Sequence, residues 1–316
     1  MKILIASPID AEAIDELRKH HDVIFAPHPT IELLQESIKD REVLVFRSGV
    51  SITAKLMVQA QNLCLLIRAG SGIDNLDLEY VYQRKIKLVR IPEPGAKAVA
   101  EMSFALMLAL SRNLLEADRS MRKGRWAKYE LSGYLLNGKT LGIIGAGSIG
   151  SLVGRMGSAW GMKVIAYDKY PTTELTNRLA AGGIHLKEFD QVITTSDYLC
   201  LHVPLDHTTH HLINADVLSR IKPGAYLINI ARGGVVDEQA LYHALTQGGR
   251  LRGAALDVHE HEGESQISPL ATLSNVILTP HIGAMTYDSQ REIGQRVVAS
   301  INTFRGGGDE EKDNKI

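Results

Sequence analysis

Three segments in the second half of the chain each place a charged or titratable side chain shortly after an apolar run. Arg232 follows LINIA, Glu262 lies a few residues after GAAL, and His281 follows ILTP. An arginine can bind a carboxylate through two parallel hydrogen bonds, and a histidine exchanges protons near neutral pH. A carboxylate beside that histidine orients the imidazole and favours its protonated form. These groups could therefore interconvert a hydroxy acid and a keto acid, with Arg232 on the substrate carboxylate, His281 as acid and base, and Glu262 as its partner.

Each of these three residues also has a simpler explanation. Arg232 could form a surface ion pair, His281 could be a turn residue after Pro280, and Glu262 could be one charge of a solvated loop. Their occurrence after separate apolar runs favours the chemical interpretation, because ligands of an open α/β sheet bind beyond the carboxyl ends of its strands. The other histidines of this half are not spaced with cysteines as zinc ligands are, so the sequence predicts no metal site.

A glycine-rich segment upstream matches the fingerprint of a dinucleotide site. LGIIGAGSIG places Gly145, Gly147 and Gly150 in the G-x-G-x-x-G pattern, between an apolar run and a helical pattern. These glycines allow a tight turn, close approach of the backbone to a pyrophosphate, and close packing of the helix on the strand. Asp168 ends the next apolar run. A carboxylate there binds the ribose hydroxyls of NAD and would repel the 2′-phosphate of NADP, so the sequence predicts NAD as the cofactor.

Short apolar runs alternate with helical patterns on both sides of a long helical segment. The runs lie at 2–7, 22–26, 43–47, 63–69 and 86–91, and then at 140–145, 163–167, 199–203, 225–230, 253–257 and 275–279. Strands that are apolar throughout and alternate with helices form parallel sheets covered on both faces. A single helix is expected over 98–123, and another over 285–304. The predicted fold is α/β, with two doubly wound parallel sheets.

The two series of strands divide the chain into two predicted domains. Residues 1–96 and 284–304 form a flavodoxin-like domain that binds the substrate. Residues 97–283 form a Rossmann NAD-binding domain inserted into the first. Residues 305–316 are rich in glycine and charge and are predicted to be a disordered tail.

Composition excludes several classes of protein. The chain has 316 residues, with 35 Lys and Arg against 36 Asp and Glu, which gives a net charge of −1. A nucleic-acid binder or a polybasic membrane anchor usually carries a basic excess, so neither is expected. No uncharged apolar run approaches the ~20 residues of a membrane helix, and the first residues lack the pattern of a signal peptide. We therefore expect a soluble, cytoplasmic protein.

Six segments together resemble the D-isomer-specific 2-hydroxyacid dehydrogenase family, and within it the catalytic portion of the phosphoglycerate dehydrogenases. They are FRSGVSIT (46–53), RAGSGIDNLDL (68–78), NGKTLGIIGAGSIG (137–150), ARGGVVDE (231–238), GAALDV (253–258) and TPHIGA (279–284). The resemblance implies the same three roles for Arg232, Glu262 and His281. Counting from Arg232 instead would put His261 in the place of the glutamate, because one residue is inserted around Gly248–Gly249.

The resemblance also implies further binding residues. It places Ser148 and Ile149 at the pyrophosphate, Val203 and Pro204 beside the adenine, and Ile230, Ala231, Asp257, Gly283 and Ala284 near the nicotinamide. It places Gly70, Ser71 and Gly72 at the substrate carboxylate. The family is typically homodimeric, which implies an interface through 98–139. No segment resembles a regulatory amino-acid-binding domain, so feedback by serine is not expected.

Two further arginines bear on the substrate. Arg47 and Arg68 end strands of the first domain, where their charges would suit a substrate with a second anionic group beside its carboxylate. A 3-phosphoglycerate-like substrate is favoured. Segment 90–101 departs from the phosphoglycerate dehydrogenase pattern, which keeps sulfonate, phosphonate, glycerate and lactate types of 2-hydroxy acid open. A different class also stays open, a non-catalytic NAD-sensing corepressor that binds protein partners.

Overall fold

The computed structural model describes residues 1–304 except residues 71 and 249. The predicted substrate residue Ser71, part of the Gly248–Gly249 insertion and the predicted tail 305–316 therefore lie outside the described residues. The chain divides into a terminal unit, formed by Met1–Gly95 and the residues from Met285 onward, and a central unit, Ala96–Ala284.

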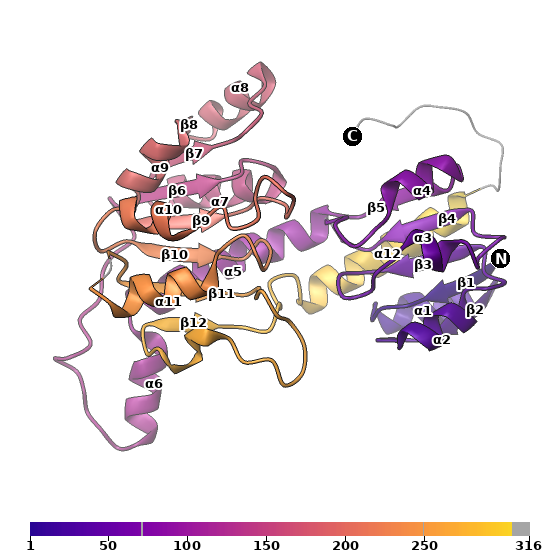
Figure 1. Ribbon diagram of the computed structural model, residues 1–316, viewed down its shortest axis with the longest axis horizontal. Coiled ribbons are helices and arrows are strands. Elements are labelled where there is room, and N and C mark those ends of the chain that lie inside the picture. The colour runs from indigo at the N-terminus through magenta and orange to yellow at the C-terminus, as the bar shows by residue number, and fades with distance from the viewer. Residues whose placement is uncertain (71, 249, 305–316) are drawn as a thin grey trace. The chain divides into compact units, whose positions relative to one another are not determined.

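The described residues of the terminal unit form a parallel five-stranded sheet in the order β2-β1-β3-β4-β5 (Figure 1). Its strands are β1 (Lys2–Ile5), β2 (Asp22–Phe25), β3 (Val43–Phe46), β4 (Leu65–Arg68) and β5 (Lys87–Arg90). This is the order of flavodoxin-like folds. The three inner strands are buried almost throughout, as expected for strands covered on both faces.

Helices cover both faces of this sheet. They are α1 (Ala11–Arg18), α2 (Ile31–Ser37), α3 (Ala54–Met57), α4 (Leu78–Gln83) and α12 (Tyr287–Thr303). One core joins Leu4 and Leu44 to α2, α3 and α4, and the other joins Ile5 and Val45 to α1 and α12. Successive strand residues thus enter opposite cores, which is the period-two alternation of a strand.

The described residues of the central unit form a parallel seven-stranded sheet in the order β12-β11-β10-β9-β6-β7-β8. Its strands are β6 (Thr140–Ile144), β7 (Lys163–Tyr167), β8 (Ile184–Leu186), β9 (Tyr198–Leu201), β10 (Tyr226–Asn229), β11 (Gly253–Leu256) and β12 (Val276–Leu278). The chain proceeds from β6 to one side and then returns to place β9 on the other, which is the switch point of a Rossmann fold. The predicted α/β fold with two parallel sheets is confirmed, although the short β8 was not predicted.

Each face of the central sheet has its own core. The helices are α5 (Glu93–Ser111), which begins at the end of the terminal unit, α6 (Leu114–Arg122), α7 (Ser148–Ala159), α8 (Thr173–Ala181), α9 (Phe189–Thr195), α10 (Ala215–Arg220), α11 (Glu238–Thr246) and the 3₁₀ turn η1 (Pro269–Thr272). One core contains residues of α5 and α7, and the other contains residues of α9, α10 and α11.

The prediction of one helix over 98–123 is wrong. The structure has α5 and α6, bent by 61° at the break between them. Asn113 has φ = 51° there, a left-handed conformation that asparagine tolerates better than most residues. The first helix also begins at Glu93, because Pro94 is compatible with the first turn of a helix, where no backbone donor is needed.

Among the described residues, no single helix is long and apolar enough to span a membrane. The bent pair α5 and α6 meets the requirements of length and composition when its two parts are taken together. In this structure Phe104, Leu106, Met107 and Leu110 of α5 are buried in the central unit.

Candidate active site

One edge of the central sheet carries most of the predicted site residues. Since its strands are parallel, the segments that follow them emerge together at the carboxyl edge. The residues concerned are Gly145 after β6, Asp168 after β7, Val203 after β9, Arg232 after β10, Asp257 after β11 and His281 after β12. The topology thus brings residues up to 136 positions apart in the chain to one sheet edge.

The glycine loop after β6 leaves open space at Gly147, where the pyrophosphate of a dinucleotide would bind. A Cβ atom on Gly150 would lie 2.1 Å from the carbonyl oxygen of Gly145, so the helix packs on the turn as closely as only glycine allows. A Cβ atom on Gly147 would meet no atom within 4 Å. Gly147 caps α7 with no side-chain acceptor on its first backbone donors. A helix N-terminus of this kind suits a phosphate, and its first residues are the predicted Ser148 and Ile149.

Asp168 lies directly against this loop. Its Oδ2 accepts a hydrogen bond from the backbone N–H of Ala146 at 2.9 Å, and its Oδ1 accepts one from Tyr170 at 3.1 Å. The carboxylate is therefore held beside the glycine turn, where the adenosine ribose of a dinucleotide would bind. The residues of this edge fit NAD.

Substitution of two of these glycines should have different consequences. Gly150→Ala places a methyl group on a backbone oxygen, so we expect a loss of roughly 1–3 kcal/mol in the free energy of unfolding. Gly147→Ala should fold normally, because its backbone lies in the extended region and the space is open. It should instead weaken NADH binding at least about tenfold, because the methyl group occupies the space that the pyrophosphate needs. Urea unfolding and NADH fluorescence titration measure both effects; a Gly147→Ala protein that binds NADH normally would contradict this assignment.

The structure places His281 against Glu262. His281 Nδ1 lies 3.1 Å from Glu262 Oε1 and 2.9 Å from Oε2. Burial raises the pKa of Glu262. The hydrogen bond and charge of His281, together with the N–H of His259, lower it by more, so the pKa of Glu262 lies below its usual value. Among the described residues Glu262 is the only side-chain partner of this imidazole, which leaves Nε2 for a proton donor or acceptor outside the chain. His261, the alternative position for the glutamate, is exposed.

The turn that carries His281 is built on Asp257. This carboxylate is buried; its Oδ1 accepts from the Thr279 hydroxyl at 2.6 Å and from Ile282 N at 2.9 Å, and its Oδ2 accepts from Gly283 N at 2.7 Å. His281 itself has φ = 54°, a strained conformation for a non-glycine residue that the turn must maintain. Asp257 therefore shapes the turn as well as lying at the predicted nicotinamide end.

Arg232 is positioned by the residue that ends β10. Buried Asn229 donates from Nδ2 to the carbonyl oxygen of Arg232 at 3.0 Å and accepts from Ala231 N at 3.1 Å. The Arg232 guanidinium donates to the carbonyl oxygen of Ala231 at 2.7 Å. Asn229 was not predicted, although a lone amide inside an apolar strand is a signal that could have revealed it.

The other predicted cofactor residues occupy the same edge. Ile230 and Ala231 are buried, Gly283 packs against Ile230 and Asp257, and Ala284 follows it. Val203 is half-buried, and the exposed Pro204 accepts a hydrogen bond from the Thr209 hydroxyl at 2.6 Å.

The predicted substrate residues belong to the terminal unit. Arg47 donates to Gln290 Oε1 at 2.5 Å, and burial lowers the pKa of its guanidinium. Arg68 is buried, donates from Nε to the carbonyl oxygen of Gly72 at 2.6 Å and lies over the Phe46 ring. Gly70 packs against the Arg68 guanidinium. Both arginines thus lie at the carboxyl edge of their own sheet.

His202, directly after β9, has both ring nitrogens buried with no hydrogen-bond partner among the described residues. Burial lowers the pKa of His202 to about 4, from an ordinary 6.5. His202 is therefore protonated below about pH 6.5 in the unfolded chain but only below about pH 4 in the folded chain. The stabilising contribution is complete above pH 6.5 and falls by up to about 3 kcal/mol as the pH drops through this window.

The replacement His202→Phe should flatten this pH dependence, because the phenyl ring cannot be protonated. Urea unfolding at pH 7.5 and pH 5 measures it, with exposed His185→Phe as the matched control. An equal loss of stability in wild type and His202→Phe would show that other groups cause the acid sensitivity.

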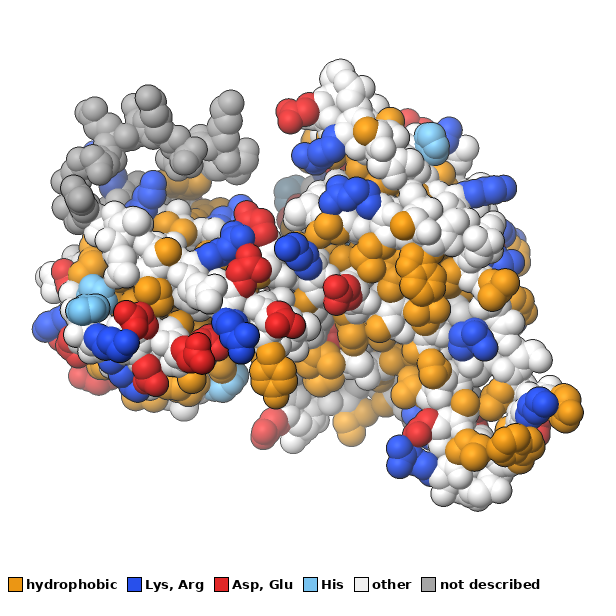
Figure 2. All heavy atoms as spheres, turned by 180° about the vertical axis from the view of Figure 1, so that it is seen from behind, with side chains coloured by type: hydrophobic (Ala, Val, Ile, Leu, Met, Phe, Trp, Pro, Cys, Tyr) orange, Lys and Arg blue, Asp and Glu red, His pale blue; other side chains and the backbone are white. Residues whose placement is uncertain are grey.

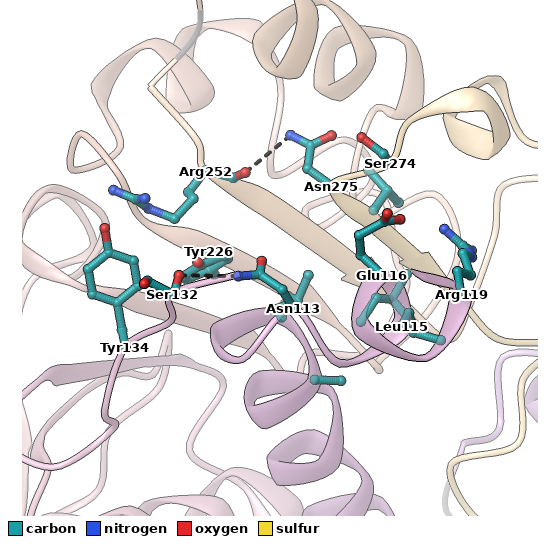
Figure 3. Close-up of a pocket in the computed structure, with 14 residues that line it drawn as sticks. Asn113, Leu115, Glu116, Arg119, Ser132, Tyr134, Tyr226, Arg252, Ser274 and Asn275 are labelled. Atoms are coloured by element: carbon teal, nitrogen blue, oxygen red, sulfur yellow. Dashed lines mark hydrogen bonds between the residues drawn. The ribbon is translucent and has the colours of Figure 1, made fainter. Parts of the chain in front are cut away.

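A cavity of about 140 Å³ lies at the opposite edge of the central sheet (Figure 3). Its wall includes Tyr226 and Asn275 at the amino ends of the strands, and Asn113, Glu116 and Arg119 from the region of α6. No predicted site residue lines this cavity. Figure 3 shows the segment around Ser132 and Tyr134 folded against it, with Asn113 Nδ2 donating to the Ser132 carbonyl oxygen at 3.3 Å.

Comparison with known proteins agrees with this geometry. The family model described as the NAD-binding domain of D-isomer specific 2-hydroxyacid dehydrogenases matches residues 104–283. The chain belongs to this family. Its NAD-binding domain thus contains the glycine loop, Asp168 and the segments after β9 to β12 described above.

Individual relatives of the family extend the similarity over nearly the whole chain. The D-3-phosphoglycerate dehydrogenase of Methanocaldococcus jannaschii is 40% identical over 308 residues, which are 97% of this chain but 58% of that protein. The hydroxypyruvate reductase of Thermotoga maritima is 37% identical over 304 residues, 95% of this chain and 97% of that protein. The chain therefore spans a little over half the length of the phosphoglycerate dehydrogenase and almost all of the reductase.

A solved structure supports the fold. The D-lactate dehydrogenase of Aquifex aeolicus, crystallised with NAD and lactic acid, is 31% identical, with a TM-score of 0.84 over 95% of this chain and 94% of that one. The family relationship and the two-sheet architecture are thus supported by both sequence and structure.

Proposed function

We propose that this 2-hydroxyacid dehydrogenase interconverts a small anionic 2-hydroxy acid and its 2-keto acid, with NAD as the hydride acceptor. The observation that carries the proposal is the Glu262–His281 pair, with Nε2 available, on the sheet edge that bears the glycine loop and Arg232. NAD, when bound, supplies the acceptor for the hydride from C2.

The side chains of this edge supply the remaining chemistry. Arg232 holds the substrate carboxylate, and His281 Nε2 removes the proton from the C2 hydroxyl or returns it to the keto oxygen. The charge that develops on the imidazole is stabilised by Glu262, whose low pKa keeps it ionised.

For the substrate, we propose a 2-hydroxy acid of the 3-phosphoglycerate type. The support is the similarity to phosphoglycerate dehydrogenases and the cationic side chain of Arg47, whose described side-chain partners, Gln290 and Met285, are both uncharged. The full-length match to a hydroxypyruvate reductase favours a second candidate, hydroxypyruvate, which lacks the phosphate.

A panel of keto acids distinguishes these candidates. NADH absorbance is followed with 3-phosphohydroxypyruvate, hydroxypyruvate, glyoxylate, pyruvate and a sulfonate analogue at equal concentrations. We expect the highest kcat/KM with the phosphorylated substrate, and Arg47→Gln should lower that preference. A higher kcat/KM with hydroxypyruvate would assign the second candidate, and no turnover with any member would refute the proposed activity.

We also propose that the chain forms a homodimer through 98–139. Large apolar side chains gather over α6 and the segment after it, seen at the lower right of Figure 2. Those at least two-fifths exposed are Leu114, Leu115, Met121, Trp126, Tyr129, Tyr134 and Leu135. A gathering of large exposed apolar side chains on one face favours an interaction site.

Light scattering on a sizing column should therefore give about twice the 34.7 kDa of one chain. The double replacement Trp126→Asp with Leu135→Asp should shift the mass to the monomer, because burying carboxylates at an interface is costly. Ile31→Asp, an exposed apolar residue of α2, is the control. A monomeric wild type, or a double variant that stays dimeric, would refute this interface.

A further inference from the structure

One residue contacts all three segments that carry the proposed catalytic side chains. His259 Nε2 lies 3.0 Å from the carbonyl oxygen of Thr279, two residues before His281. The backbone N–H of His259 lies 3.2 Å from Glu262 Oε1. Its carbonyl oxygen packs against Gly233, beside Arg232, where a Cβ atom would come within 1.8 Å.

The contact with Thr279 fixes how the imidazole of His259 is oriented. A carbonyl oxygen can only accept a hydrogen bond, so Nε2 must carry the hydrogen. The same Thr279 oxygen accepts from the backbone N–H of His281 at 3.0 Å. One acceptor therefore joins the ring of His259 to the backbone of His281.

The opposite side of the imidazole faces a buried carboxylate. His259 Nδ1 is buried without a hydrogen-bond partner among the described residues, and Glu238 Oε1 lies 3.8 Å from it. Glu238, on α11, is 3% exposed. Its carboxylate accepts from the backbone N–H of Glu260 at 2.9 Å and from the Ser268 hydroxyl at 2.5 Å.

These contacts tie the loop that carries Glu262 to the rest of the central unit. Glu260 Oε1 lies 2.7 Å from His211 Nε2, which adds a second attachment. On the far side of Glu262 the chain continues into Gly263, with φ = 128° and open space around it. The contacts of residues 259 and 260 therefore attach the segment that leads into Glu262 to α11 and to His211.

We propose that His259 is a positioning residue for the Glu262–His281 pair. It does not contact the reacting atoms. It holds the Glu262 segment by its backbone N–H and the His281 segment by its ring, and so sets the distance between carboxylate and imidazole. This inference rests on the proposed function of that pair. His259 itself belongs neither to the glycine fingerprint nor to the three proposed catalytic residues.

Three variants test the proposal. His259→Phe keeps an aromatic ring but removes the donor to Thr279, whereas the side-chain amide of His259→Gln can restore a donor at the position of Nε2. His261→Phe makes the same change at an exposed histidine two residues away. We expect His259→Phe to lower kcat about 10- to 100-fold, because misplacement by about 1 Å costs up to this much, while KM and NADH affinity change less than about twofold.

The pattern among the variants decides between positioning and a general loss of folding. His259→Gln should recover most of kcat, and His261→Phe should match wild type. Partial unfolding would instead lower the NADH-binding stoichiometry together with kcat. An unchanged kcat in His259→Phe, or the same loss of kcat in His259→Gln, would overturn the proposal.

A second measurement does not depend on turnover. The hydrogen-bonded proton between His281 Nδ1 and Glu262 should give a downfield NMR resonance, assigned by its absence in His281→Gln. The resonance should move upfield or disappear in His259→Phe and stay unchanged in His261→Phe. If wild type is inactive but the resonance responds, the proposed function fails and the positioning role stands. If wild type is active and neither kcat nor the resonance responds, the positioning role fails and the function stands.

Discussion

Replacing His281 with glutamine should lower kcat by roughly 10²–10⁴ while NADH binding stays within about twofold of wild type. Glutamine can still reach Glu262 by a hydrogen bond, but it cannot accept a proton from the C2 hydroxyl. NADH binding is preserved because the glycine loop and Asp168 are independent of this side chain. Stopped-flow or steady-state absorbance at saturating substrate gives kcat, and fluorescence titration gives the NADH affinity.

The exposed His185 on β8 provides the matched control for this replacement. His185→Gln should retain full activity, since the residue lies at the other end of the sheet order from β12. If His281→Gln retained more than about a tenth of wild-type kcat, another group would have to be the acid and base.

Arg232→Gln should raise KM for the 2-keto acid by a factor of about 30 or more, because a charge-paired hydrogen bond of this kind is worth about 2–5 kcal/mol. The KM of Arg232→Lys should lie between those of wild type and the glutamine variant, since lysine keeps the charge but loses the planar pair of donors. Only the affinity for the keto acid should fall, and the affinity for NADH should change little. Initial rates over a range of keto acid concentrations measure both variants.

Arg250, exposed and before the amino end of β11, is the control for the loss of an arginine. Arg250→Gln should leave KM unchanged. A normal KM in Arg232→Gln would show that the substrate carboxylate binds elsewhere, and the cations of the terminal unit would then be the next candidates.

Much of the fold could be predicted because the strands are marked by short hydrophobic runs in the sequence itself. Runs such as VLVF and YLCL contain only hydrophobic residues and are buried at every position, and such runs become inner strands of a covered sheet. The break at Asn113 could not be predicted in this way. Residues 98–123 keep a helical pattern on both sides of it, and the left-handed conformation of one asparagine is decided by packing.

The site divides along the same line. The glycine fingerprint and Asp168 directly follow a strand, and Arg232 and His281 come shortly after one. These residues can be recognised in the sequence because parallel strands bring the segments after their carboxyl ends together. Asn229, Glu238 and His259 were not predicted as site residues. Asn229 acts on its own turn, through Ala231 and Arg232. The roles of Glu238 and His259 arise from pairings between segments about 20 residues apart, such as His259 with Thr279, and such pairings depend on the conformation of loops.

The central claim is direct hydride transfer between NADH and C2 of a 2-keto acid, with the proton supplied by His281. The most direct test uses NADH that carries deuterium at C4 of the nicotinamide, with product analysis by mass spectrometry and chiral chromatography. When the deuterium occupies the C4 position that donates the hydride, it should appear at C2 of a D-2-hydroxy acid, one atom per NADH consumed. A product without deuterium at C2 from either C4 stereoisomer of the labelled cofactor, or an L-configured product, would contradict the account.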